Sequence, residues 1–524
     1  MSIVSAYLRL ARAGWILTRE GVISALPAEG LQGLPAFAHR MAALLARRRS
    51  LGRERAERMS RAVQQLGPSY IKLGQFLATR PDVVGQDVAL DLARLQDRLD
   101  FFPMEEAQAA IEGSLGRPLD DLYLTFEEPI AAASIAQVHP ATIEKNGRIT
   151  RVAVKVIRPG VRQRFANDLE SFFAVARMQE RYVPSSRRLR PVQVTQTLAQ
   201  STKIEMDLRL EAAAISELYE NTREDPGFRV PEVDWERTGR DVLTIEWIDG
   251  IKMSNIEGLR AAGHDLPHLA QVLIQSFLRH TLRDGFFHAD MHPGNLFVDA
   301  AGDIVAVDLG IVGRLGKKER RYLAEILYGF ITRDYRRVAE VHFEAGYVPH
   351  KHSVGSFAQA IRAIGEPIHG QPAETISMAK LLTLLFEVTE LFDMATRPEL
   401  LLLQKTMVVV EGVARSLDSH FNMWKTSEPV VGDWIAKNLG PLAIVTDARD
   451  TATALLHLAR QAPDVAGKVQ AISEELDRFI DKGLRLDSET IKLMARTRRF
   501  EQRLGTLALW VVAIAAIVLI WHVA

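Results

Sequence analysis

The chain has 524 residues, of which 47% are hydrophobic and 25% are charged, a composition typical of globular rather than disordered proteins. Its 65 Lys and Arg residues balance 65 Asp and Glu residues, so the whole chain lacks the positive excess of a nucleic-acid-binding protein. It contains no Cys, which excludes disulfides, thiol catalysis and zinc sites built on thiolates.

Residues 1–60 are predicted to form an amphipathic helical region. Apolar residues recur at helical spacing near the N-terminus, interrupted by charged residues such as Arg9, Arg12 and Arg19. The stretch lacks the uninterrupted apolar core and the cleavage site of a signal peptide. Packing of this helix on the protein itself is the favoured interpretation, and binding to a membrane surface is the alternative.

Residues 61–120 are predicted to be a further helical region. An Arg-rich helical pattern runs from residue 31 to residue 99, and it is interrupted at Gly67, Pro68, Pro81 and Gly85. Another helix is predicted over residues 105–115, ended by Gly116 and Pro118.

The pattern changes to that of a mixed lobe over residues 121–250. Short β-branched or alternating runs predict strands over residues 122–126, 134–138, 149–157 and 242–247, with a turn at Gly147. Helices are predicted over residues 164–179 and 192–219. A helical lobe follows over residues 251–430, broken only by a strand pair around residues 295–308 that turns at Gly302.

A further helical region is predicted over residues 431–503, and a transmembrane helix over residues 504–523. The latter stretch has no charged side chain and matches one bilayer crossing in length. Basic residues such as Arg498, Arg499 and Arg503 precede it, which places the rest of the chain in the cytoplasm. A buried C-terminal helix is the alternative. Residues 439–458 contain charged residues and are not predicted to form a second span.

The strongest chemical signal is the segment HADMHPGNLFV, which begins at His288 and is followed by IVAVDLG at residues 304–310. Phosphoryl transfer needs a carboxylate that orients or deprotonates the attacking group, and oxygen ligands that hold Mg²⁺ on the phosphates. Kinases supply these groups as H-R-D-x-x-x-x-N followed by D-F-G. Asp290 is therefore the predicted catalytic carboxylate, and Asn295 and Asp308 are the predicted metal ligands. Helix capping or loop salt bridges are the alternative for the two aspartates.

His288 and His292 flank Asp290 and could form a metal site with it. No third ligand clusters with them in the sequence, and Asp290 already has a role in the kinase interpretation. A structural role beside the site is therefore favoured for both histidines.

A kinase also requires a strand lysine and a helix glutamate that fixes it. The segment V-A-V-K makes Lys155 the polar residue of an alternating apolar run, as in the V-A-I-K motif. Its partner is expected on a helix before Asp290, where Glu205, Asp207 and Glu211 are candidates and Glu211 is preferred.

The residues expected to contact the nucleotide match the kinase motifs less closely. No G-x-G-x-x-G precedes Lys155, and an alanine-rich loop replaces it, formed by Ala131, Ala132, Ala133 and Ser134. Alanine allows close approach to phosphates, but its Cβ removes the positive-φ conformations that glycine adopts easily. Glu246 and Ile248, between a strand and the helical lobe, fit the linker that contacts adenine.

Together, A-A-A-S before V-A-V-K, H-A-D-M-H-P-G-N, D-L-G and an upstream K-L-G-Q resemble the UbiB family of atypical protein-kinase-like proteins. The resemblance runs from about residue 66 to residue 418 and implies an α+β, two-lobed kinase-like fold that uses ATP and Mg²⁺. It also implies a role in ubiquinone biosynthesis. Some members are called 2-polyprenylphenol hydroxylases, but this sequence has no flavin motif and no evident iron or haem site, which argues against that activity.

The resemblance implies regulatory residues as well. Lys72 and Gln75 match an inhibitory K-x-G-Q segment laid over the active site, and Glu205 and Asp207 match an E-x-D motif that anchors it. From the residues alone, K-x-G-Q at a helix break would be interpreted as a C-cap. The kinase roles fall on Lys155, Glu211, Asp290, Asn295 and Asp308. Bacterial members commonly end in two transmembrane helices, where this sequence predicts one.

Three functions compete. An ATPase that supports ubiquinone biosynthesis, through lipid handling or the assembly of quinone-synthesis enzymes, explains the occluding segment, the altered loop and the anchor together. A phosphotransferase acting on a small molecule or a protein would use the same Asp290 loop. A pseudokinase scaffold would bind nucleotide without chemistry, but it has no need of Asp290 as a base. The expected partners are ATP, a membrane lipid or quinone precursor and quinone-biosynthesis enzymes, not nucleic acid, at the inner membrane in a bacterium.

Overall fold

The structure is a computed structural model, which describes residues 3–25, 34–47, 50, 53–78, 84, 86–93, 100–182, 190–369, 388, 391–394 and 398–439. The chain divides into two compact units, Met1–Ala436 and Lys437–Ala524, and nearly all described residues belong to the first. Within these described ranges, no helix is both long and apolar enough to cross a membrane. The transmembrane helix predicted over residues 504–523 lies outside them, as does most of the predicted region 431–503.

The N-terminal part is helical, as predicted. Its helices are α1 (Ile3–Arg19), α2 (Leu34–Leu45), α4 (Arg55–Leu66), α5 (Pro68–Ala78) and α7 (Gln86–Ala93), with a 3-10 turn η1 (Ile23–Ala25). Helix α1 packs on α10 (Val161–Tyr182), where Arg9 Nε donates to Ser171 Oγ at 3.2 Å. Gly67, at φ 96°, separates α4 from α5. Residues 72–75 therefore lie inside α5 rather than at a helix break, so the C-cap interpretation is wrong.

An antiparallel five-stranded sheet follows. Its strands are β1 (Thr125–Phe126), β2 (Ala131–Ala132), β3 (Ala136–Lys145), β4 (Arg148–Ile157) and β6 (Val242–Glu246), in the order β1-β3-β4-β6 with β2 beside β3. Asn146 and Gly147, both at positive φ, form the two-residue turn between β3 and β4. The strand predicted over residues 122–126 is partly wrong, because Pro118 and the acidic residues after it start a short helix, α9 (Leu119–Leu122).

Helix α8 (Met104–Leu115) covers one face of this sheet. Ala107 and Ile111 of α8 are fully buried in one cluster with Val152, Val154 and Val156 of β4. The alternation of valines in β4 places one set of side chains in this core and leaves Lys155 on the other face.

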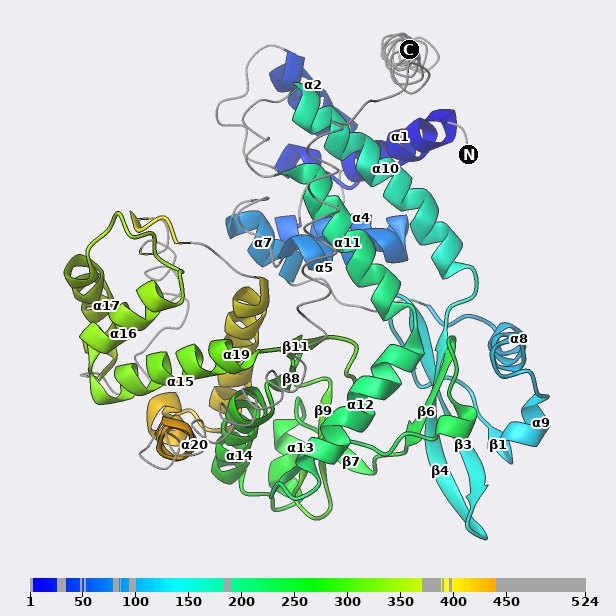
Figure 1. Cartoon of the computed structure of the whole chain (residues 1–524). Helices are drawn as coiled ribbons and strands as arrows, with labels where there is room; N and C mark the ends of the chain where they lie inside the picture. The colour runs from blue at the N-terminus through cyan, green and yellow to red at the C-terminus, as the bar shows by residue number, and fades with distance from the viewer. Residues whose placement is uncertain are drawn as a thin grey trace, which may run out of the picture. The chain divides into compact units, whose positions relative to one another are not determined.

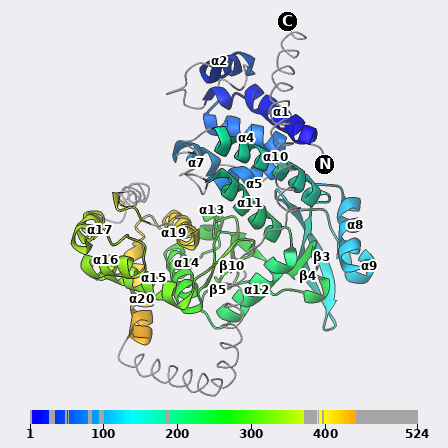
Figure 2. The ribbon, with the colours of Figure 1, turned by 45° about the horizontal axis from the view of Figure 1, so that its top comes forward.

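Three helices lie between β4 and β6 of this sheet in the chain: α10, α11 (Pro191–Glu205) and α12 (Leu208–Thr222). The single helix predicted over residues 192–219 is wrong, because Asp207 caps a new helix there by accepting a hydrogen bond from Arg209 N–H. Helices α10 and α11 pack on α5, and both views show them beside it (Figures 1 and 2).

The C-terminal lobe is mainly helical but contains more strands than predicted. Its helices are α13 (Ile256–Ala261), α14 (Leu266–Arg279), α15 (Lys317–Thr332), α16 (Tyr335–Glu344), α17 (Val354–His369), α19 (Pro398–Leu417) and α20 (Met423–Leu439). The predicted strand pair is β9 (Leu296–Asp299) and β10 (Ile304–Ala306), flanked by β5 (Phe228–Arg229) and β7 (Gly250–Lys252). A π-helical turn, η4 (His280–Asp284), leads into β8 (Phe286–His288), which pairs with β11 (Val312–Arg314). Three-residue strands are too short to show a period in the sequence.

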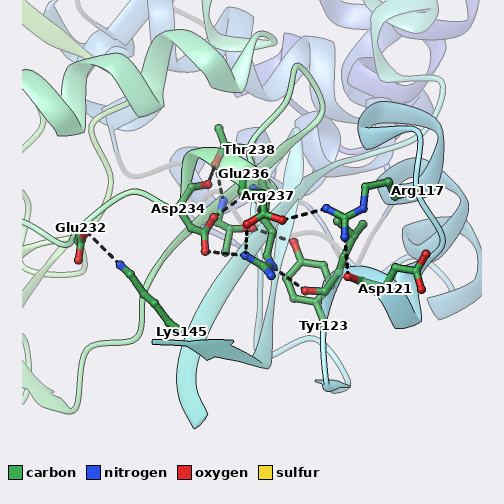
Figure 3. Close-up of polar contacts among 11 residues, drawn as sticks. Arg117, Asp121, Tyr123, Lys145, Glu232, Asp234, Glu236, Arg237 and Thr238 are labelled. Carbon is green, nitrogen blue, oxygen red and sulfur yellow. Dashed lines mark hydrogen bonds and ion pairs between the residues drawn. The ribbon is translucent and has the colours of Figure 1, made fainter. Parts of the chain in front are cut away.

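A polar cluster fixes β6 to the segment around α9 (Figure 3). Arg237, in the 3-10 turn η3 (Trp235–Arg237), donates to the Leu122 carbonyl at 2.5 Å and to Asp234 Oδ2 at 3.1 Å. The Tyr123 hydroxyl lies 2.8 Å from Thr244 Oγ1, which donates to the Arg237 carbonyl at 2.8 Å. Because Thr244 belongs to β6, this cluster holds the strand that leads to the predicted adenine linker.

Candidate active site

Lys155 of β4 contacts two carboxylates from distant parts of the chain. Its Nζ donates to Glu211 Oε1 at 2.8 Å and Oε2 at 2.9 Å, at the start of α12. The same Nζ lies 3.4 Å from Asp308 Oδ2, just after β10. The side chains of Lys155 and Glu211 are 17% and 6% exposed, whereas that of Asp308 is 43% exposed. Of the three acidic candidates, Glu211 is therefore the one that contacts the lysine.

The electrostatics of this cluster follow from two carboxylates sharing one ammonium group. Burial raises the pKa of Glu211 to about 7; Lys155 opposes this rise and Asp308 adds to it. Burial opposes ionisation of Asp308 too, but Lys155 and the Gly310 N–H, which donates to Oδ1 at 3.0 Å, hold its pKa well below the usual range. Burial alone would lower the pKa of Lys155, but Asp308 and Glu211 raise it above its ordinary value. One lysine therefore does not fully neutralise the acidic groups around it.

Asp290 lies on the loop between β8 and β9, where two histidines shape the backbone. His288 Nδ1 accepts a hydrogen bond from Asp290 N–H at 3.2 Å, and His292 Nδ1 accepts one from Gly294 N–H at 2.9 Å. Burial lowers the pKa of His288, so the neutral ring can act as this acceptor. In the part of the chain that the structure describes, no three His, Asp or Glu side chains form a candidate metal cluster. Each histidine ring thus accepts a backbone hydrogen bond within the Asp290 loop.

Backbone hydrogen bonds join the Asp290 loop to the Asp308 segment. Ala289 N–H donates to the Ile311 carbonyl at 3.0 Å, and Val307 N–H donates to the Asn295 carbonyl at 3.0 Å. The pairings of β8 with β11 and of β9 with β10 extend this connection. The predicted catalytic carboxylate and the predicted metal ligands therefore belong to one hydrogen-bonded framework.

Asn295 and Asp308 offer oxygen atoms of the kind that Mg²⁺ prefers. The Asn295 amide nitrogen donates to the Asp290 carbonyl at 3.2 Å, so Oδ1 is the atom that would contact a metal ion. Asp308 accepts from Gly310 through Oδ1, and its partly exposed side chain keeps Oδ2 beside Lys155. The donor set fits Mg²⁺ bound with a nucleotide, where the ion would neutralise phosphate charge.

The alanine-rich segment forms a tight hairpin into β3. Ala131 and Ala132 make up β2, and Ala133 N–H donates to the Ala136 carbonyl at 2.8 Å. Ser134 is fully buried in the turn. The strand predicted over residues 134–138 therefore begins only at Ala136, because the preceding residues form the turn.

A buried amide that the sequence prediction missed supports this hairpin. Gln137 donates from Nε2 to the Phe102 carbonyl at 3.2 Å and accepts from Phe102 N–H at 3.0 Å. Its Nε2 also lies 2.9 Å from His139 Nε2, and His139 Nδ1 lies 2.9 Å from the Glu127 carbonyl. Two polar residues spaced by two in an otherwise buried strand were the available signal.

The lysine of the K-x-G-Q segment contacts one of the two acidic residues of the E-x-D motif. Lys72 Nζ lies 2.5 Å from Glu205 Oε2, and both side chains are largely buried. The charge of Lys72 also lowers the pKa of Asp308, by less than Lys155, the Gly310 N–H and His288 do. Gln75 is half-buried three residues further along α5. Asp207 instead pairs with Arg209, with Oδ2 2.7 Å from Nη2.

The predicted adenine linker begins with a structural ion pair. Glu246 accepts from Arg229 Nη1 at 3.1 and 3.2 Å, and Arg229 Nε donates to Asp299 Oδ2 at 3.0 Å. The side chain of Glu246 thereby joins β6 to β5 and β9. Ile248, two residues later, is half-buried.

Thr406 of α19 is a site residue that the sequence prediction missed. It is buried, and its Oγ1 lies 3.0 Å from the Ala289 carbonyl and 2.8 Å from the Leu402 carbonyl, to either of which it can donate. The signal was a polar residue on the buried face of an apolar helix, three residues after Leu403 and four before Val410, both buried.

A strand lysine held by a helix glutamate, next to an Asp–Asn loop and a D-L-G segment, defines this protein as kinase-like. Residues 94–342 match the ABC1 atypical kinase-like domain, and residues 361–422 match the UbiB helical domain. The chain belongs to the UbiB family, as the resemblance of its motifs indicated.

Three bacterial relatives carry the name "Probable protein kinase UbiB". The protein of Marinobacter nauticus is 39% identical over 78% of this chain and 76% of its own length. That of Aeromonas hydrophila is 37% identical over 91% of this chain and 88% of its own, and that of Pseudomonas aeruginosa is 39% identical over 80% and 79%. A solved chain described as the Rv3197–erythromycin complex of Mycobacterium tuberculosis is 25% identical, with a TM-score of 0.48, over 72% of this chain and 97% of its own.

Proposed function

We propose that this protein binds Mg-ATP and hydrolyses it in support of ubiquinone biosynthesis. The observation that carries the proposal is the contact of Lys155 with Glu211 and Asp308 at the same time. In phosphoryl transfer a lysine of this kind contacts the nucleotide phosphates, while an Asp and an Asn hold the metal. Membership of the UbiB family supports the link to ubiquinone.

Each residue of the site has a role in this proposal. Lys155 neutralises phosphate charge, and Glu211 fixes the lysine on β4. Asp290 orients or deprotonates the attacking water, and Asn295 and Asp308 hold Mg²⁺. The alanine-rich hairpin covers the phosphates. Residues 504–523 anchor the chain in a membrane, where a lipid or quinone precursor would meet it.

The Lys72–Glu205 ion pair favours hydrolysis over transfer to a protein. It holds α5 within electrostatic reach of Asp308. The resemblance to the UbiB family implies that this segment covers the place where a protein kinase would accept its substrate. A phosphotransferase is the second candidate, favoured by the name of the relatives.

Mg-ATP turnover by the full-length protein, with and without liposomes and a phenolic quinone-precursor analogue, tests the proposal. Asp290→Asn should lower kcat by about 10²–10⁴-fold, because it removes the general base while keeping the shape of the side chain. Asp120→Asn, at an exposed position of α9, is the control. Undiminished phosphate release in Asp290→Asn would refute the role of this residue.

Two other outcomes point elsewhere. A phosphorylated lipid, phenol or protein acceptor would favour the phosphotransferase. Bound ATP with no phosphate release under any condition would favour a scaffold.

A further inference from the structure

The peptide group just before Asp290 is held on both of its polar atoms by buried side chains. Its N–H, that of Asp290, donates to His288 Nδ1 at 3.2 Å. Its carbonyl, that of Ala289, lies 3.0 Å from the hydroxyl of Thr406. Thr406 and His288 are each 1% exposed, so water does not substitute for either contact.

The other backbone groups of Ala289 and Asp290 are also hydrogen-bonded. Ala289 N–H donates to Ile311, and the Asp290 carbonyl accepts from His292 N–H at 2.9 Å and from Asn295 Nδ2 at 3.2 Å. These partners all belong to the strands and loops of the site itself. Thr406 is the exception, because it comes from α19, more than a hundred residues later, within the segment that matches the UbiB helical domain.

We propose that Thr406 is a positioning residue, through which helix α19 fixes the orientation of Asp290. A rotation of the Ala289–Asp290 peptide would turn the Asp290 Cα–Cβ bond, so the hydroxyl that holds this carbonyl also sets the direction of the carboxylate. Thr406 touches neither nucleotide nor metal in this role. The inference rests on the proposed function, since it assigns Asp290 to the reaction.

A simpler role for the hydroxyl has to be distinguished. Threonines in helices often donate to the carbonyl four residues earlier, and Thr406 lies 2.8 Å from that of Leu402. Thr195 of α11 is a matched control, because it is buried and its hydroxyl donates to the Pro191 carbonyl four residues earlier at 2.9 Å. Thr195→Val removes the within-helix bond alone.

The test compares Thr406→Val, Thr406→Ser and Thr195→Val in the full-length protein. Each is measured for kcat and KM with Mg-ATP, for melting temperature, and for amide hydrogen exchange across residues 286–296. We expect Thr406→Val to lower kcat by about 10- to 100-fold with KM unchanged, since small misplacements of a reacting group have costs of this order. Exchange across the loop should be faster in this variant. Thr406→Ser and Thr195→Val should match the parent.

The outcomes separate the two proposals. Parent-like kcat and exchange in Thr406→Val would overturn the positioning role. An equal loss in Thr406→Ser would also overturn it, because it would indicate packing of the methyl group. An equal loss in Thr195→Val would overturn it too, because it would show that loss of a within-helix hydrogen bond has the same effect. If the parent itself releases no phosphate, the proposed ATPase activity fails. In that case amide exchange across the loop tests the inference. Faster exchange in Thr406→Val, but not in the other two variants, would support the contact. Unchanged exchange in Thr406→Val would refute it.

Discussion

The two ends of helix α12 carry buried carboxylates with opposite properties. Glu211, in its first turn, and Asp225, three residues beyond its end, both have side chains that are 6% exposed. Asp225 accepts from His280 at 3.2 Å and from Arg283 at 2.6 and 3.0 Å. Burial would raise the pKa of Asp225, but these two donors hold it well below the usual range. For Glu211, burial raises the pKa to about 7 in spite of Lys155.

Burial raises the pKa of both carboxyl groups, most of all that of Glu211, and the donors around each group decide how much of this rise is offset. Glu211 shares Lys155 with Asp308, and Asp225 likewise shares Arg283 with Asp284. Asp225 has in addition Arg279 at 3.9 Å and a contact with His280 at 3.2 Å. The Asp225 cluster is electrostatically complete and joins the end of α12 to the π-helical turn before β8. The Glu211 cluster retains uncompensated negative charge beside the D-L-G segment, which a divalent cation would neutralise. Two carboxyl groups with equally exposed side chains can therefore differ in charge balance, and the less balanced one, Glu211, lies in the proposed site.

Removing the charge of Asp308 would leave Lys155 to Glu211 alone. We expect this change to have the largest effect, on the affinity for Mg-ATP. Asp308→Asn keeps the size of the side chain and an acceptor for Gly310 but loses the charge offered to Mg²⁺. Because even groups outside the ligand shell change metal affinity by about 10–100-fold, we expect Mg-dependent ATP affinity to fall by at least about 100-fold. Calorimetric titration with Mg-ATP and with metal-free ATP measures this effect. Equal Mg-dependent affinity in parent and variant would show that Asp308 does not hold the ion.

Removing the charge of Asp225 should lower the stability of the protein and leave its affinity for Mg-ATP unchanged. Asp225→Asn weakens the bonds from His280 and Arg283, and hydrogen bonds to charged groups contribute about 1.5–3 kcal/mol each. We expect the free energy of unfolding to fall by about 2 kcal/mol, measured by urea denaturation, with Mg-ATP affinity unchanged. Asp120→Asn should change stability by less than about 0.5 kcal/mol, as exposed substitutions do. A loss of ATP affinity in Asp225→Asn at full stability would mean that both ends of α12 serve the site.

The sequence predicted the contacts at the Glu211 end better than the helices that carry them. Lys155, Asp290, Asn295 and Asp308 stand in motifs with fixed spacing, so their proximity in the structure could be expected. Glu205, Asp207 and Glu211 were all expected on one helix, and Glu211 was the preferred partner of Lys155; the structure has this contact. The helix break at Asp207 was not predicted, because the apolar pattern continues through this position.

What the sequence did not reveal depends on contacts between distant segments. The Asp225 cluster joins residues more than fifty positions apart, and neither His280 nor Arg283 stands in a motif. The hydroxyl of Thr406 reaches Ala289 across 117 positions. Such contacts arise from packing of α14 and α19 around the loop, which local periodicity cannot specify.

The smallest expected effect, on pH dependence, sharpens the comparison most directly. A carboxyl group whose folded pKa is raised from 4.5 to about 7 binds a proton in the folded state before the unfolded state does. Glu211 should therefore add stability as the pH falls from about 7 towards 4.5, and this contribution is lost as the pH rises through 7. Asp225, with its depressed pKa, should lose stability only at pH values below about 4.

Urea denaturation of the parent and of Glu211→Gln at pH 7 and pH 6 isolates this contribution, because Gln cannot titrate. Burial lowers the pKa of His280, which destabilises the folded state as the pH falls, but this effect is common to both proteins and cancels in the difference. The stability of the parent relative to Glu211→Gln should rise by about 1 kcal/mol between pH 7 and pH 6, since one pKa unit corresponds to about 1.4 kcal/mol. A difference that stays constant or reverses would show that Lys155 keeps Glu211 ionised. In that case the two ends of α12 would be electrostatically alike, and the argument for a missing cation would rest on Asp308 alone.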